Sequence, residues 1–103
     1  DSLRVPASSI IGTVELQFDF GNGEKRRFEG SIVKGMTLLD TLYGAAEAGK
    51  IEVVINGNKL ASIGGYKNEK SQAWNIYRNK KKISTNAWGV PISDKDEVLL
   101  KYE

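Results

Sequence analysis

Residues 13–33, TVELQFDFGNGEKRRFEGSIV, decide the fold of this 103-residue chain, together with residues 37–49, TLLDTLYGAAEAG. Every second residue from Val14 to Phe20 is apolar, which is the pattern of a strand with one face buried. Gly21-Asn22-Gly23 tolerates the positive φ angles of a tight turn, and residues 25–33 then return as a second strand. This stretch therefore predicts an antiparallel hairpin.

Residues 37–49 predict one helix. Thr37 is placed to cap its start, and Asp40, three positions later, completes a capping box and complements the positive end of the helix dipole. Gly49 stands where a left-handed residue is expected to end the helix. One face of the helix is apolar at 3.6-residue spacing and consists of Leu38, Leu39, Leu42, Ala45 and Ala46.

The second half of the chain is a series of short strands and turns. Strands are predicted over residues 51–55, 60–63, 73–78 and 97–102, separated by Gly-, Asn- and Asp-rich turns. Two strands, one helix and then several strands form an α+β order, and one helix crossing the face of a mixed sheet of short strands is the layout of a β-grasp fold. We expect residues 1–9 to be a linker or tag-like segment and residues 10–103 to form a single domain.

Composition excludes several classes of function. The chain has no cysteine and no histidine, so it lacks a thiolate nucleophile, a Ser-His-Asp triad and the commonest metal-ligating side chain, and we expect no enzyme. A net charge of +2, from 15 basic and 13 acidic residues, is too small to indicate nucleic acid. No apolar run approaches the length of a membrane span. The only methionine is Met36, which suggests a processed chain or an excised domain.

The aromatic residues Tyr66, Trp74, Tyr77 and Trp88 lie in the turn-rich half and are the first candidates for ligand contact. The alternative is that Trp74, Trp88 and a tyrosine fill the core. Gly64-Gly65 permits close approach of a ligand to the backbone, although paired glycines more often form a turn.

Two charged clusters are better explained by structure than by a site. The basic run Arg78, Lys80, Lys81 and Lys82 is interpreted as a solvated hairpin tip rather than a polyanion site. The acidic residues Asp94, Asp96 and Glu97 are interpreted as a structural turn, because a calcium loop needs more oxygen ligands and a glycine at its bend.

Four blocks of the sequence, in this order, resemble the C-terminal domain of transcobalamin and intrinsic factor and the bacterial transcobalamin-like domains. They are residues 34–42 (KGMTLLDTL), 61–66 (ASIGGY), 73–79 (AWNIYRN) and 86–98 (NAWGVPISDKDEV), followed by a strand that ends in Tyr102. The chain departs from the family pattern at Lys80 and Lys95, where the family usually has glycine.

The resemblance implies a β-grasp domain that binds a soluble ligand or serves as a module of an extracytoplasmic protein. In transcobalamin the equivalent domain closes over cobalamin together with a larger helical domain. We therefore expect a monomeric, non-catalytic module of a secreted or cell-surface bacterial protein, whose partner is a small molecule or a neighbouring protein domain. No cofactor is assigned, and cobalamin is the most specific ligand candidate. The predicted ligand contacts are Gly64, Gly65, Tyr66, Trp74, Tyr77, Asn86 and Trp88.

Three alternatives stay open at this point. The domain could be a structural or adhesive spacer that contacts only proteins. A ubiquitin-like sulfur carrier shares the β-grasp fold but ends in Gly-Gly, whereas this sequence stops at Lys101-Tyr102-Glu103. An enzyme is the remaining alternative, in which Asp94 or Asp96 would carry the chemistry.

Overall fold

The structure, a computed structural model, describes residues 9–103, so all but the last residue of the predicted 1–9 linker lies outside the described residues. The predicted hairpin is present, with β1 (Ile10–Asp19) antiparallel to β2 (Lys25–Val33). Leu16 pairs with Phe28, and both side chains face the same side of the sheet as the buried Phe18. The alternation of the sequence thus fixes which face of the hairpin is covered.

Helix α1 (Leu38–Gly49) begins as predicted and ends differently. The Asp40 N–H donates to Thr37 Oγ1 at 3.2 Å and the Thr37 N–H donates to Asp40 Oδ2 at 2.9 Å, which is a complete capping box. The predicted left-handed residue, Gly49, is still helical, and Lys50 adopts the left-handed conformation instead, with φ 55°. Gly49 instead allows close packing of the helix end against the sheet, because a Cβ there would lie 2.5 Å from Phe28 Cζ.

The remaining strands form two sheets rather than one. The strands are β3 (Val53–Asn56), β4 (Lys59–Ile63), β5 (Tyr66–Lys67), β6 (Trp74–Arg78), β7 (Lys81–Ile83) and β8 (Asp96–Tyr102). The larger sheet has the order β2-β1-β8-β6-β7, in which only β1 and β8 are parallel, and β3-β4-β5 form a separate antiparallel sheet. The predicted α+β, β-grasp-like fold is confirmed, and the separate small sheet adds a feature that the sequence pattern did not indicate.

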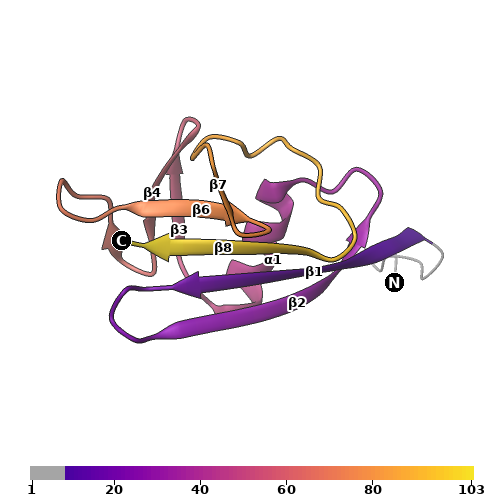
Figure 1. The fold of residues 1–103 in the computed structure, drawn as a ribbon, viewed down its shortest axis with the longest axis horizontal. Coiled ribbons are helices and arrows are strands. Elements are labelled where there is room, and N and C mark those ends of the chain that lie inside the picture. The colour runs from indigo at the N-terminus through magenta and orange to yellow at the C-terminus, as the bar shows by residue number, and fades with distance from the viewer. Residues whose placement is uncertain (1–8) are drawn as a thin grey trace.

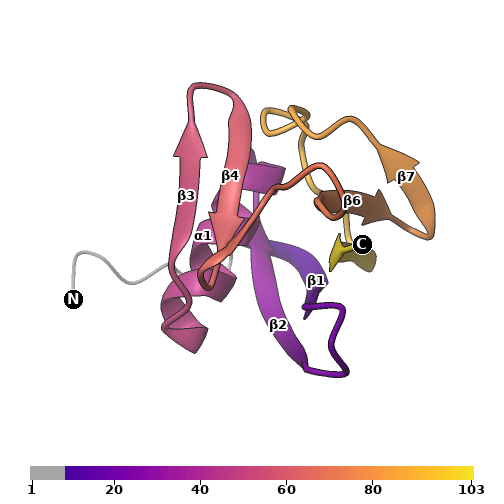
Figure 2. The same ribbon diagram turned by 90° about the vertical axis from the view of Figure 1, so that its left-hand side faces the viewer.

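Helix α1 and the small sheet lie on the same side of the five-stranded sheet, and the other side of that sheet faces the viewer in Figure 1. Figure 2 shows β3, β4 and α1 together on one side and β6 and β7 on the other. The core fills the space between these layers, and its largest fully buried side chains include Trp74, Phe18, Leu16, Ile32, Leu42 and Leu100. The sheet therefore has one covered face and one open face, as is common for sheets with antiparallel strands.

Two turns adopt backbone conformations that usually favour glycine. Asn79 and Lys80 both have positive φ angles, 52° and 72°, as the two-residue turn between β6 and β7 requires. Lys95, just before β8, has φ 66°. Lys80 and Lys95 are the two positions where the family that the sequence resembles usually has glycine, and both lysines adopt the left-handed conformation that glycine favours.

Candidate functional site

The seven predicted contact residues do not form one site. Trp74 packs at the end of the core, with its ring centroid 5.1 Å from that of Tyr102 and 5.6 Å from that of Phe20. Its side chain is 2% exposed, and its indole N–H donates to the Tyr66 carbonyl at 2.8 Å. The Tyr66 ring joins the same cluster, 5.0 Å from Phe20, so the core alternative describes Trp74 better than direct ligand contact.

Trp88 is also buried, at 7% exposure, and its indole N–H donates to the Asn58 carbonyl at 2.8 Å. Its own carbonyl accepts from the Leu39 N–H, so the residue ties its loop to the β3–β4 hairpin and to the start of α1. Asn86 is exposed and hydrogen-bonds Ser84 within that loop. Neither indole therefore presents a free face to a ligand in this conformation.

Gly64 and Gly65 form the turn between β4 and β5, with φ angles of 59° and 87°. Both angles lie in the left-handed region, so the turn itself accounts for the glycines. A Cβ on Gly64 would also lie 3.3 Å from the Phe20 ring. The geometry matches the turn alternative, and a ligand role for these two glycines stays a prediction.

Tyr77 is the predicted contact residue that lies on the open face of the five-stranded sheet. It pairs with Leu99 on β8, and Leu99 pairs in turn with Gln17 on β1. A hollow of about 520 Å³ covers this region, and its lining includes Tyr77, Leu99, Gln17, Asp19, Glu97 and Lys101. This volume is within the range of about 300–1,000 Å³ typical of small-molecule sites.

The charges around this hollow balance. Three carboxylates (Glu15, Asp19 and Glu97) and three amino groups (Lys25, Lys80 and Lys101) line it, with Tyr77 and Leu99 between them. A balanced rim selects neither a polyanion nor a cation, because opposite charges cancel at a distance. The arrangement suits a ligand without net charge that carries both hydrogen-bond donors and acceptors around an apolar body.

The hydroxyl of Tyr77 is held in place by Glu103. It donates to Glu103 Oε2, which also accepts from Asn75 Nδ2 at 3.2 Å. The hydrogen bond to the Glu103 carboxylate is the main cause that raises the pKa of Tyr77 above 10.0, and burial and the charge of Glu103 add to it. Tyr77 therefore stays protonated at neutral pH and offers a fixed ring.

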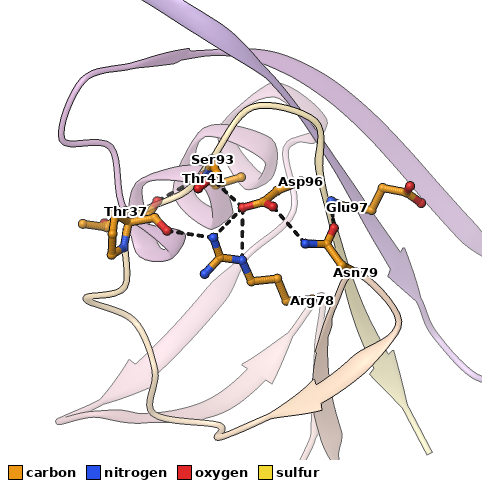
Figure 3. A network of polar contacts seen from close by, with 8 residues as sticks. Thr37, Thr41, Arg78, Asn79, Ser93, Asp96 and Glu97 are labelled. Atoms are coloured by element: carbon orange, nitrogen blue, oxygen red, sulfur yellow. Dashed lines mark hydrogen bonds and ion pairs between the residues drawn. The ribbon is translucent and has the colours of Figure 1, made fainter.

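The acidic cluster at the start of β8 is structural (Figure 3). Asp96 Oδ2 accepts from Arg78 Nη2 at 2.6 Å and from the Ser93 N–H at 2.8 Å, and Oδ1 accepts from Asn79 Nδ2 at 2.9 Å. Burial alone would raise the pKa of Asp96, but these hydrogen bonds and the charge of Arg78 outweigh it and hold the pKa below 3.8. The network joins β6 to β8 and the preceding loop.

Most residues of the hollow that were not predicted from the sequence lie at outward-facing positions of β1 and β8, while Lys25 lies on β2 and Lys80 in the turn between β6 and β7. Glu97, Leu99 and Lys101 alternate with the buried Val98, Leu100 and Tyr102. Leu99 is an apolar residue at an outward-facing position of β8, where its neighbours Glu97 and Lys101 are charged. This exception to the alternation was the feature of the sequence that could have indicated a contact surface on the open face. The contribution of β1 could not be found this way, because its pairing with β8 joins segments about 80 residues apart.

Within residues 9–103 there is no group of three or more His, Cys, Asp or Glu side chains arranged to hold a metal ion. The lining of the hollow includes no histidine, the commonest side chain that ligates a transition metal. Among the same residues, no helix is both long and apolar enough to cross a membrane.

Neither a protein-family model nor a curated protein matches the sequence. Solved structures do match the fold. Haptocorrin in complex with Cbi superposes with a TM-score of 0.71 over 91% of this chain at 11% identity, and the match covers 26% of the haptocorrin chain. A candidate metal-binding protein from Ruminococcus gnavus ATCC 29149 superposes with a TM-score of 0.62 and 16% identity, over 89% of this chain and 96% of that one. At such identities the likeness shows the fold alone, and this chain spans about a quarter of the haptocorrin chain.

Proposed function

We propose that this chain is a non-catalytic binding module of an extracytoplasmic protein, and that it holds a neutral, flat ligand on the open face of its five-stranded sheet. The observation that carries the proposal is the hollow of about 520 Å³, with Tyr77 and Leu99 between three carboxylates and three amino groups. Because most of this lining is charged or polar, a ligand held there would be oriented by polar contacts around the apolar surface of Tyr77 and Leu99.

Two features support a ligand of the corrinoid class. The fold resembles that of a segment of haptocorrin, a protein solved in complex with Cbi, and four blocks of the sequence resemble the C-terminal domain of transcobalamin. A corrinoid is flat and rimmed by neutral hydrogen-bonding groups, which suits the balanced rim of the hollow. Because the hollow is shallow, this module would cover one side of the ligand, and a neighbouring domain would cover the other.

The absence of catalysis is proposed from the chemistry available. The sequence has no His and no Cys. The pKa values of Tyr77 and Tyr102 are raised above 10.0 and that of Asp96 is lowered below 3.8, so none of these three groups becomes a general base or acid near pH 7. Secretion or surface attachment is proposed from the transcobalamin resemblance, and we also propose that the module is monomeric.

The test is a titration with cobalamin, whose visible absorption permits equilibrium dialysis without a label. Backbone amide shifts in NMR spectra should change on β1, β6 and β8 and should leave α1 unchanged. Tyr77→Ala should weaken binding about tenfold, which is the expected effect of losing one aromatic contact. Tyr43→Ala, which removes an exposed tyrosine from α1, is the matched control and should bind like the wild type.

Each negative outcome has its own meaning. If dialysis shows no uptake, the proposal that this module itself holds a corrinoid is overturned. If uptake occurs but Tyr77→Ala and Tyr43→Ala behave alike, the ligand lies elsewhere and the open face is not the site. The second candidate function, a domain that contacts only proteins, is favoured by a different observation, the uncovered edge of β2.

A further inference from the structure

Strand β2 forms one edge of the five-stranded sheet, and among residues 9–103 it pairs only with β1. The Phe20 N–H donates to the Glu24 carbonyl, and the hydrogen-bonded pairs of the hairpin therefore involve the even-numbered residues of β2. The N–H and C=O groups of Lys25, Arg27, Glu29 and Ser31 consequently point away from β1. The opposite edge, β7, has only three residues, whereas β2 has nine.

An apolar hollow of about 230 Å³ lies beside this edge, between β2 and α1. Its lining includes the apolar side chains of Val14, Leu16 and Phe28 together with the two glycines Gly30 and Gly44. This edge therefore offers two kinds of contact side by side. The outward N–H and C=O groups of β2 can form hydrogen bonds, and the recess next to them can accept an apolar side chain.

The recess is kept open by two glycines that the fold does not require. Gly30 and Gly44 are absent from the residues with positive φ, and a Cβ built on either would meet no atom within 4 Å. Gly44 lies in the middle of α1, where glycine costs about 1 kcal/mol relative to alanine. Neither backbone conformation nor crowding explains these glycines, while the open recess does.

We propose that β2 and this recess bind an extended polypeptide segment of a partner protein, which adds to the sheet as a further strand. Strand addition at an exposed edge, with side chains seated in an adjacent groove, is an established mode of peptide recognition. A residue paired with Gly30 would direct its side chain to the covered face of the sheet, over the recess, because paired residues on neighbouring strands share a face. An apolar side chain belongs there.

Charge fixes a second position in the bound segment. Lys25 and Arg26 form no ion pair with a carboxylate among the described residues, and the Arg26 guanidinium lies over the Phe28 ring at 5.5 Å. An acidic side chain opposite Arg26 would complement this end of the strand. Arg26 and Gly30 are four residues apart, so the partner segment carries its acidic and apolar residues four positions apart.

A second copy of this chain satisfies these requirements less well. In the antiparallel register that places Phe28 of one copy opposite Gly30 of the other, Glu29 faces Glu29 and Arg26 faces Ile32. Like charges directly opposite each other destabilise a strand pair. The edge is therefore assigned to a different polypeptide, which agrees with a monomeric module.

The experiment is selection of random ten-residue peptides displayed on phage against the wild-type domain. Gly44→Leu fills the recess without strain, because leucine is a good helix former and its Cβ position is empty. Tyr43→Leu places the same side chain on the neighbouring, 47% exposed position and is the matched control. Enriched peptides should share an apolar and an acidic residue four positions apart, bind Gly44→Leu about tenfold more weakly and bind Tyr43→Leu like the wild type.

A charge reversal tests the second position. Arg26→Glu should weaken the selected peptides severalfold, and selection on this variant should replace the acidic residue with a basic one. The proposal is overturned if no peptide is enriched, if enriched peptides bind Gly44→Leu as tightly as the wild type, or if sedimentation shows a doubled mass without peptide. Cobalamin uptake by Gly44→Leu should equal that of the wild type, which separates this edge from the open face of the sheet.

Discussion

Two glycines of α1, five residues apart, stand in opposite surroundings. A Cβ on Gly49 would lie 2.5 Å from the Phe28 ring and 3.1 Å from Ile51, whereas a Cβ on Gly44 would meet nothing within 4 Å. The first glycine allows the end of the helix to approach the sheet, and the second leaves space beside β2. The region around Gly49 is thus closed by packing. The region around Gly44 stays open, although alanine at that position would make the helix more stable.

The same contrast holds at the scale of the whole sheet. Along the β6–β8 pair, the aromatic rings of Trp74 and Tyr102 pack at one end and the Arg78–Asp96 ion pair closes the other, and no buried side-chain polar atom in residues 9–103 lacks a hydrogen bond. Along β2 and on the open face, hollows of about 230 and 520 Å³ remain. Stability therefore depends mainly on the closed region, and binding is expected in the open ones.

The largest loss of stability is expected from a substitution in the core of the closed region. Trp74→Ala should lower the free energy of unfolding by about 3–5 kcal/mol, because it empties a fully buried site and leaves the Tyr66 carbonyl without its indole donor. Leu99→Ala on the open face should cost no more than about 1 kcal/mol. Urea unfolding followed by circular dichroism measures both. Equal losses for the two variants would contradict the division into closed and open regions.

Local features of the fold were predictable from the sequence, and long-range ones were not. The capping box of Thr37 and Asp40 depends on residues three positions apart, and the strand phase of β1 depends on simple alternation. The burial of Trp88 depends on the Asn58 carbonyl, 30 residues away, and nothing in the flanking sequence specifies that contact. The same holds for the open face, which exists only because β8 inserts between β1 and β6.

The second prediction tests the ion pair of the closed region and its dependence on pH. Asp96→Asn should cost about 3 kcal/mol at pH 7, because it leaves the partly buried Arg78 without a counter-charge. The pKa of Asp96 is lower in the folded state than its ordinary 3.8, so the wild type keeps this contribution above about pH 4 and loses it as the pH falls further.

Urea unfolding of both proteins between pH 3 and pH 7 measures this difference. The gap between wild type and Asp96→Asn should be constant above about pH 5 and should narrow below pH 4. A gap that stays constant to pH 3 would show that the Asp96 carboxylate is not coupled to folding. Asp19→Asn, a change of a half-buried strand-end carboxylate that forms no ion pair among the described residues, serves as the control for general charge effects.

The third prediction sharpens the comparison of the two helix glycines. Gly49→Ala should destabilise the domain by about 1 kcal/mol, because the clash with Phe28 exceeds the gain in helix propensity. Gly44→Ala should stabilise it by about 0.5–1 kcal/mol, because only the propensity changes. Thermal unfolding of the two single variants measures effects of opposite sign, and effects of equal sign would contradict the assignment of closed and open sides to this helix.

The smallest effects are expected at the two turns where lysine occupies a left-handed conformation. Lys80→Gly and Lys95→Gly should each stabilise the domain by about 0.5–1 kcal/mol, because glycine adopts φ angles of 72° and 66° without the steric cost of a Cβ. Lys82→Gly in β7, where the backbone is extended, is the matched control and should destabilise by a similar amount.

Since these turns join strands of the closed region, the gain should appear in urea unfolding and leave peptide binding at β2 unchanged. A loss of stability in Lys80→Gly would mean that the lysine side chain itself, rather than the turn conformation, holds the β6–β7 hairpin in place.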